Sequence, residues 1–112
     1  MRPLPKVQSL KEAVEQVIES NIADGYRPRD FIKATEYGNA PDLPTVCRRL
    51  IYSAEALQFI EDKIEDIPTL LTLEDFVCSH GSEWKLFDNA TIERACASRD
   101  RFDQVAKEKR YT

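Results

Sequence analysis

Residues 42–68 read DLPTVCRRLIYSAEALQFIEDKIEDIP, and the spacing of their apolar side chains decides the fold that the sequence predicts. Asp42 can cap a helix at the start of this stretch, and Pro68 ends it. Between them, two rows of mostly apolar residues repeat every seven positions, as in the a and d positions of a heptad. The rows are Leu43, Leu50, Leu57 and Ile64, and Val46, Ser53, Ile60 and Ile67. The pattern predicts one central helix over residues 43–67, roughly 37 Å long at 1.5 Å per residue.

Tyr52 and Phe59 are also seven residues apart, on the side of this helix away from the heptad stripe. A helix that is apolar on two sides is either packed on both sides or offers one side to a partner. Trp84, the only tryptophan, either covers an end of the bundle or anchors a partner as well. Four acids in the same helix would steer a basic partner: Glu61, Asp62, Glu65 and Asp66.

Further helices are indicated on both sides of this central segment. Ser9 and Glu12 form a capping box at the start of a helix over residues 10–24. A shorter helix is expected over 28–37, and a last one over 90–109, capped by Asp88 or Asn89.

The segment before the last helix is ambiguous. Thr72 and Asp75 can cap a short helix, but the run TLLTLEDFV also suits a strand, which would give a small hairpin near residues 70–87. We expect a single helical domain over residues 1–112. It is an all-α, compact bundle of four to five helices around the long central helix.

The composition suits a folded chain: 42% of the 112 residues are hydrophobic and 32% are charged. No apolar run reaches the length of about 18 residues that a membrane span needs. The first ten residues, MRPLPKVQSL, lack the apolar core of a secretory signal. Cys47, Cys78 and Cys96 are odd in number and form no CxxC motif, which favours free thiols in a reducing compartment. We therefore expect a cytoplasmic protein.

The charge is uneven along the chain. Residues 53–88 carry 9 acidic and 2 basic side chains, whereas the whole chain has a net charge of −4. Nucleic-acid-binding domains are usually basic, so this acidic middle argues against them as a class.

One stretch nevertheless suits nucleic acid. The segments DFIKATEYG and LPTVCRRL meet across Gly38, and PTVCRRL resembles the recognition-helix starts of bacterial winged-helix and helix-turn-helix regulators. Ala34 and Gly38 fit the spacing of that motif, whereas Pro44 stands where it has a β-branched residue. The resemblance implies a DNA-binding regulator with these contacts: Arg27, Arg29, Lys33, Thr45, Arg48 and Arg49. The alternative is a corner of the bundle with solvated arginines.

Catalytic and metal-binding patterns are weak. The carboxylate pairs Glu12/Glu15 and Asp62/Glu65 resemble the magnesium-binding pairs of all-α nucleotide pyrophosphohydrolases, which gives a remote third function as a Mg²⁺-dependent phosphohydrolase. His80 is the only histidine, and its spacing from the cysteines is not that of a zinc site. The three glycines form no phosphate loop. We expect no catalytic residue, no metal and no cofactor.

The sequence thus predicts a small, non-catalytic, cytoplasmic interaction or regulatory protein. Its partner would be another protein or a second copy of the chain, with no membrane involved, and Tyr52, Phe59 and Trp84 would be the anchors.

Overall fold

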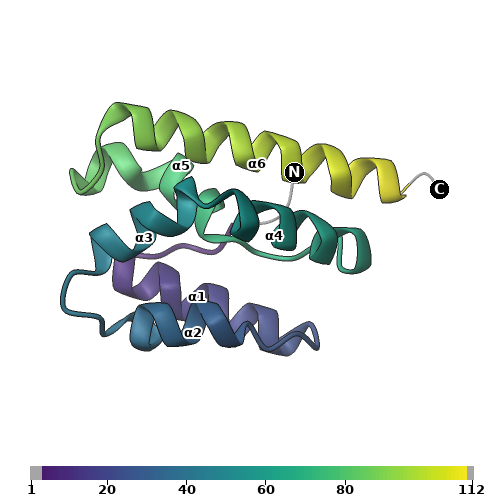
Figure 1. Cartoon of the computed structure of the whole chain (residues 1–112), viewed down its shortest axis with the longest axis horizontal. Helices are drawn as coiled ribbons and strands as arrows, with labels where there is room; N and C mark the ends of the chain where they lie inside the picture. The colour runs from purple at the N-terminus through teal and green to yellow at the C-terminus, as the bar shows by residue number, and fades with distance from the viewer. Residues whose placement is uncertain (1–3, 111–112) are drawn as a thin grey trace.

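Six α-helices and one short 3₁₀ helix make up residues 4–110, the part of the chain that the computed structural model describes (Figure 1). No strand occurs in this part, so the all-α bundle is confirmed, and residues 73–84 form a helix in place of the alternative hairpin. The elements follow one another as α1 (Leu10–Ala23), α2 (Arg29–Thr35), the 3₁₀ helix η1 (Glu36–Gly38), α3 (Leu43–Tyr52), α4 (Ala54–Asp66), α5 (Leu73–Trp84) and α6 (Asn89–Arg110).

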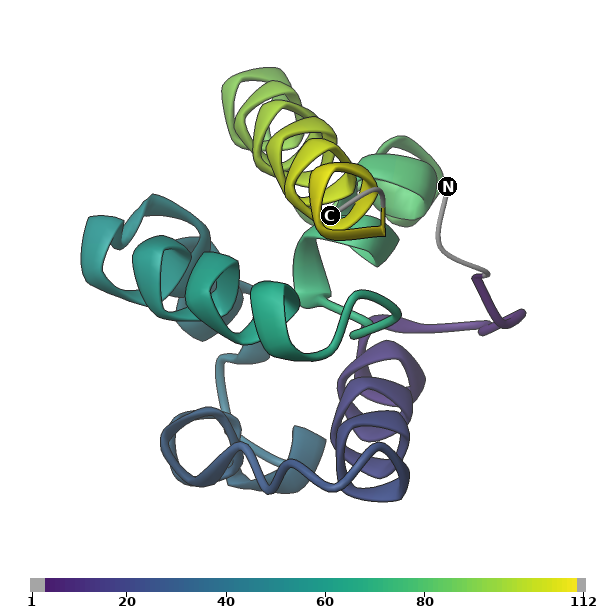
Figure 2. The same cartoon turned by 90° about the vertical axis from the view of Figure 1, so that its right-hand side faces the viewer.

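The helices are arranged in three pairs. In both views α3 and α4 lie between the α5–α6 pair and the α1–α2 pair (Figures 1 and 2). Helix α6, with 22 residues, runs along the long axis of the molecule (Figure 1). Only residues 85–88 connect α5 to α6, so the two helices are antiparallel neighbours. None of the helices in residues 4–110 is both long and apolar enough to cross a membrane.

The single helix expected over residues 43–67 is wrong: the chain breaks it at Ser53. Ser53 has extended backbone angles, φ −78° and ψ 113°, and its Oγ accepts a hydrogen bond from the Ala56 amide at 3.1 Å. It is therefore the N-cap of α4, a position that serine favours over the interior of a helix. The break leaves carbonyl groups at the end of α3, and the Arg94 Nε donates a hydrogen bond to one of them, Ile51 O, at 3.3 Å.

The centre of the fold lies instead at residues 70–77, all of which are buried. Three clusters form the hydrophobic core, and this segment contributes to each of them. Leu73 and Val77 belong to the cluster shared with α1, α3 and α6, whereas Leu70 belongs to the cluster between α4 and α6. Leu71 and Phe76 pack in the third cluster, against α1. The central segment thus joins parts of the core that the other helices supply separately.

A buried capping box starts α5 within this segment. The Thr72 amide donates to Asp75 Oδ2 at 2.9 Å, the Thr72 hydroxyl donates to the same oxygen at 2.8 Å, and the Asp75 amide donates to Thr72 Oγ1 at 3.3 Å. The side chains are only 2% and 6% exposed. Since water is excluded there, these bonds satisfy amides that nothing else would reach. The Thr72–Asp75 cap expected from the sequence is confirmed.

Two of the three cysteines differ from the expectation of free thiols. Cys78 of α5 and Cys96 of α6 form a disulfide, and only Cys47, which is buried in α3, is a free thiol. The odd number of cysteines misled the prediction because it is equally compatible with one bond and one buried thiol. The disulfide fixes α5 to α6 along their packed faces.

We predict that replacing Thr72 by Val lowers the free energy of unfolding by about 1–3 kcal/mol, because the buried Asp75 amide loses its acceptor. Ser9→Ala, which removes the solvent-exposed cap of α1, is the matched control and should cost about 0.5–1 kcal/mol. Urea unfolding followed by circular dichroism measures both. If Thr72→Val lowered the free energy of unfolding by no more than Ser9→Ala does, the buried cap would not stabilise the central segment.

Candidate binding groove

A groove with a volume of about 600 Å³ lies between α4 and the α1–α2 pair. Ala56, Phe59 and Ile60 of α4 form one wall, and Phe31 of α2 lies on the other. Ser53 also lines the groove, so the break between α3 and α4 lies at its edge. We refer to this space as the α4 groove.

Two aromatic rings and a lysine join the walls at the rim of the groove. The ring centres of Tyr26, in the turn between α1 and α2, and Phe59, on α4, are 6.1 Å apart. The Lys63 Nζ lies 5.0 Å from the Tyr26 ring centre and 5.5 Å from that of Phe59, within the range of cation–π attraction. Burial and the negative charge of Asp30 raise the pKa of Tyr26, so its hydroxyl stays neutral at physiological pH. We call this group the Tyr26–Phe59–Lys63 clasp.

The floor of the α4 groove is mostly apolar, with three buried polar residues, Asn21, Thr72 and Glu74. Val17, Leu70 and Leu71 supply apolar surface. Asn21 is 3% exposed, and its amide nitrogen donates to Leu71 O at 3.0 Å. Glu74, at the start of α5, also lines the groove and is 2% exposed. The groove therefore offers mainly apolar surface to a ligand.

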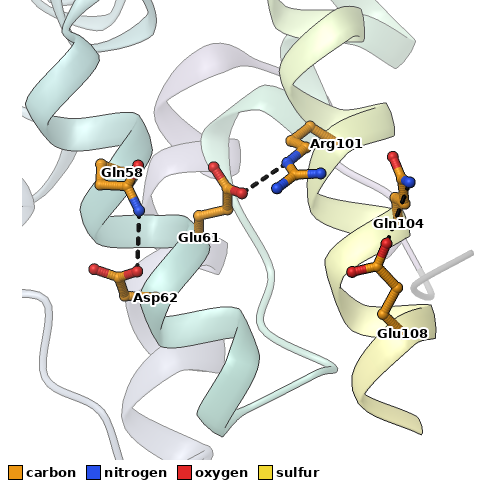
Figure 3. Close-up of polar contacts among 6 residues, drawn as sticks. All are labelled: Gln58, Glu61, Asp62, Arg101, Gln104 and Glu108. Atoms are coloured by element: carbon orange, nitrogen blue, oxygen red, sulfur yellow. Dashed lines mark hydrogen bonds and ion pairs between the residues drawn. The ribbon is translucent and has the colours of Figure 1, made fainter. Parts of the chain in front are cut away.

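The acids of α4 have different surroundings, although the sequence suggested one set (Figure 3). Glu61 points across to α6 and forms an ion pair with Arg101, with 2.7 Å between Oε1 and Nε. Its side chain is only 20% exposed, so Glu61 belongs to the α4–α6 contact. Asp62 accepts a hydrogen bond from Gln58, one turn earlier, at 3.1 Å. Four acids of α4 face solvent: Glu55, Asp62, Glu65 and Asp66.

Tyr52 and Phe59 do not lie in the same hollow, because the helix breaks between them. Phe59 is 50% exposed and lines the α4 groove. Tyr52 is 40% exposed and lies against the guanidinium groups of Arg48 and Arg94, 5.6 and 5.0 Å from its ring centre. Both side chains are exposed, as an anchor must be, but only Phe59 is at the edge of the groove.

Trp84 occupies the covering position that the sequence left as one of two alternatives. It is partly buried, packs against two of the three core clusters, and stacks on His80 with 5.4 Å between ring centres. Its contacts lie within the fold.

The basic residues expected to meet nucleic acid are divided between two places. Arg27 and Arg29 line the α4 groove, whereas Arg48 and Arg49 line a separate hollow on α3 together with Thr45 and Tyr52. Lys33 is exposed on α2. Seven residues, 36–42, connect α2 to α3, whereas a helix-turn-helix has a turn of about 3–4 residues.

The residues considered for metal binding and catalysis are not brought together. Within residues 4–110, no three cysteine, histidine or carboxylate side chains gather closely enough to hold a metal ion. The carboxylate pairs Glu12/Glu15 and Asp62/Glu65 therefore stay on separate helices, α1 and α4. Burial raises the pKa of the Cys47 thiol to about 12, and the charge of Glu74 adds to the shift, so Cys47 is not a nucleophile at neutral pH.

Comparison of the chain with protein-family models, curated proteins and solved structures gives no match.

Three residues of the α4 groove escaped the sequence analysis: Tyr26, Lys63 and Glu74. No local pattern pairs Tyr26 with Phe59, since 33 positions separate them and their contact depends on the α3–α4 break. No local pattern marks Glu74 as buried, because glutamate is almost never fully buried unless paired. Its burial follows from the position of α5 at the centre of the core.

We predict that Cys47 reacts with a disulfide reagent at about pH 8 only when the protein unfolds, because its thiol is buried and protonated. Since the pKa rises from 9.0 to about 12 on folding, the folded state binds more protons above pH 9. The stability from this group is complete below pH 9 and is lost as the pH rises toward 12. The difference in unfolding free energy between wild type and Cys47→Ala isolates this loss from other titrations. Rapid labelling of the folded protein would contradict the prediction.

Proposed function

We propose that the chain is a small, non-catalytic protein-interaction module whose α4 groove receives an amphipathic helix of a partner protein. The observation that carries this proposal is the 600 Å³ groove with the half-exposed Phe59 at its rim. Protein interiors are close-packed and contain few voids larger than a water molecule. A groove of this size beside an exposed aromatic ring is therefore more consistent with a binding surface than with a packing defect.

The shape and lining of the groove suit a helix. Helix-in-groove recognition uses apolar side chains at intervals of three and four residues, which enter a hydrophobic groove between helices. The α4 groove runs between two helical walls and has an apolar floor, so one or two such side chains would fit between Phe59 and Phe31. To enter, they would displace the clasp that closes the rim, which needs rotation of the exposed Phe59 and of the partly buried Tyr26 and Lys63.

The charges on the α4 wall favour a basic partner, whereas Arg27 and Arg29 lie on the opposite side of the groove. Glu55, Asp62 and Asp66 are four, three and seven residues from Phe59, so they lie on the same side of α4 as that ring. Lys63, the one base of this helix, is held over the Tyr26 and Phe59 rings. The acidic row extends beyond the groove, which favours an extended partner over a small ligand. Complementary charges of this kind speed the encounter and fix its orientation.

A second copy of the chain is a less suitable partner. In a two-fold dimer the same surface meets itself, so α4 would face α4 and its exposed acids would oppose one another. The arrangement of the basic residues gives the DNA-binding alternative little support, because Arg27 and Arg29 are separated from Arg48 and Arg49. A cytoplasmic location remains a prediction from the sequence. The Cys78–Cys96 disulfide removes the argument from free thiols, since disulfides persist mainly in oxidising compartments.

We predict that a fluorescent Leu–Lys amphipathic helix of about five turns, roughly 18 residues, binds the protein, and that a Leu–Glu helix of the same length does not. Ala56→Trp, which fills the groove from α4, and Phe59→Ser should each weaken binding about tenfold or more, as expected for a central aromatic contact. Fluorescence anisotropy measures the affinities. The backbone amides of residues 53–63 should show the largest NMR shifts.

Matched variants control for general effects of the substitutions. Leu86→Ser removes a similarly exposed apolar side chain, 46% against 50% for Phe59, outside the groove. Asp62→Asn with Asp66→Asn should weaken binding, whereas Glu19→Gln with Glu93→Gln changes the net charge equally and should not. The proposal would be contradicted if the Leu–Lys and Leu–Glu peptides bound equally well. It would also be contradicted if Leu86→Ser lost as much affinity for the peptide as Phe59→Ser. Sedimentation at rising protein concentration tests for a dimer. If the protein self-associates and Phe59→Ser abolishes the association, the occupant of the groove is a second copy of the chain and not a partner helix.

A further inference from the structure

A second hollow, of about 380 Å³, lies on α3 and is lined by Thr45, Arg48, Arg49 and Tyr52. We call it the arginine hollow. Its lining holds two guanidinium groups and two hydroxyl groups, and none of the four residues carries a carboxylate. Such a lining stands out in a chain with a net charge of −4, because its polar groups are cations and hydroxyls, set in mostly apolar surface.

A third arginine adds to this positive charge from another helix. Arg94 of α6 lies 5.0 Å from the Tyr52 ring centre, and Arg48 lies 5.6 Å from the same centre. The Arg94 Nε is also held by its hydrogen bond to Ile51 O. The Tyr52 ring thus contacts both guanidinium groups and the Ile51 carbonyl holds one of them, so the side chains of Arg48 and Arg94 have less entropy to lose on binding.

The carboxylate beside this group is largely engaged elsewhere. Asp88 faces Arg48 from the start of α6, but its Oδ1 accepts hydrogen bonds from both the amide and the hydroxyl of Thr91. These bonds and the charge of Arg48 lower the pKa of Asp88, which therefore stays ionised as the N-cap of α6. Asp88 offsets part of the charge of Arg48, whereas the lining of the hollow itself holds two arginines and no carboxylate.

We propose that the arginine hollow binds a phosphate monoester. Arg48 and Arg49 would donate hydrogen bonds to its oxygens, the Thr45 hydroxyl would add another, and Arg94 would be a positioning residue that holds Tyr52 and strengthens the positive field. A monoester has three terminal oxygens and a charge close to −2 at neutral pH. It matches paired guanidinium forks better than a carboxylate or a diester, each with a single negative charge.

The same chemistry has two sources, a small organic phosphate and a phosphorylated protein side chain. Phenyl phosphate stands for the first, and a peptide with one phosphotyrosine stands for the second. This site does not involve the α4 groove, so the proposal goes beyond the interaction function and can fail without affecting it.

We expect both probes to shift the NMR signals of residues 45–52 and of the Arg48 and Arg49 side chains at low salt. The tighter of the two identifies the source. Binding should strengthen from about pH 5 to about pH 7.5, as the probe loses its second proton with a pKa of about 6. Arg48→Gln with Arg49→Gln should weaken it about tenfold or more. Arg27→Gln with Arg29→Gln, which removes the same charge from the α4 groove, should leave it unchanged.

The double variant also removes the contact between Arg48 and the Tyr52 ring. Arg49→Gln alone keeps that contact and therefore tests the loss of a guanidinium group by itself. Arg94→Gln should weaken binding less than Arg49→Gln and reduce the dependence on pH only slightly. The proposal is overturned by an absence of shifts at about 10 mM probe. It is also overturned by equal losses in the Arg27/Arg29 variant, or by a DNA duplex that binds through the same residues more tightly than either monoester.

Discussion

The buried capping box of Thr72 and Asp75 is the interaction on which the rest of this structure depends. It starts α5 in the interior, where no water can satisfy the free amides of a first helical turn. Because the cap is internal, residues 70–77 can be buried without leaving these amides unbonded. All three core clusters draw side chains from this short segment. Helices α1, α3 and α6 pack against α5, which this segment starts, and the Cys78–Cys96 disulfide holds α6 to α5.

One side of α4 is left open because the helix packs mainly against α6 on its other side. Helix α4 is held mainly by α6, through Ile64 in the shared core cluster and through the Glu61–Arg101 ion pair (Figure 3). Toward α1 and α2 it has mainly the Tyr26–Phe59 contact at the rim of the groove. Because α6 holds α4 along one side and only the rim contact bridges the other, α4 can accept a partner on that other side without disturbing the core. The two proposed sites thus use α3 and α4, mainly on opposite sides of the break at Ser53.

Much of the fold was predictable from local chemistry. The caps at Ser9 and Thr72 were visible because their side chains act within three residues along the chain, and Asp88 was one of the two candidates for the last helix. The return bond of the Ser9 capping box differs from the prediction, since Glu12 accepts from the Gln8 amide at 2.7 Å instead of from that of Ser9. The break at Ser53 was not, since an interruption of one residue keeps the seven-residue spacing of the apolar side chains. The disulfide was equally invisible, because three cysteines allow several pairings and only the packing of α5 on α6 selects one. The groove had no signal in the sequence, because its walls come from segments far apart in the chain.

Native-state hydrogen exchange is the measurement that tests the central role of residues 70–77 most directly. Amides that open only when the whole protein unfolds exchange with the global free energy of unfolding, whereas less stable elements exchange through local opening. The amides of Phe76 and Val77 should be among the slowest to exchange, with the free energy obtained from urea unfolding. The amides of α4 should exchange faster, through local opening at the groove. If α4 or α1 proved the most protected while α5 exchanged through local opening, the core would be organised around another helix.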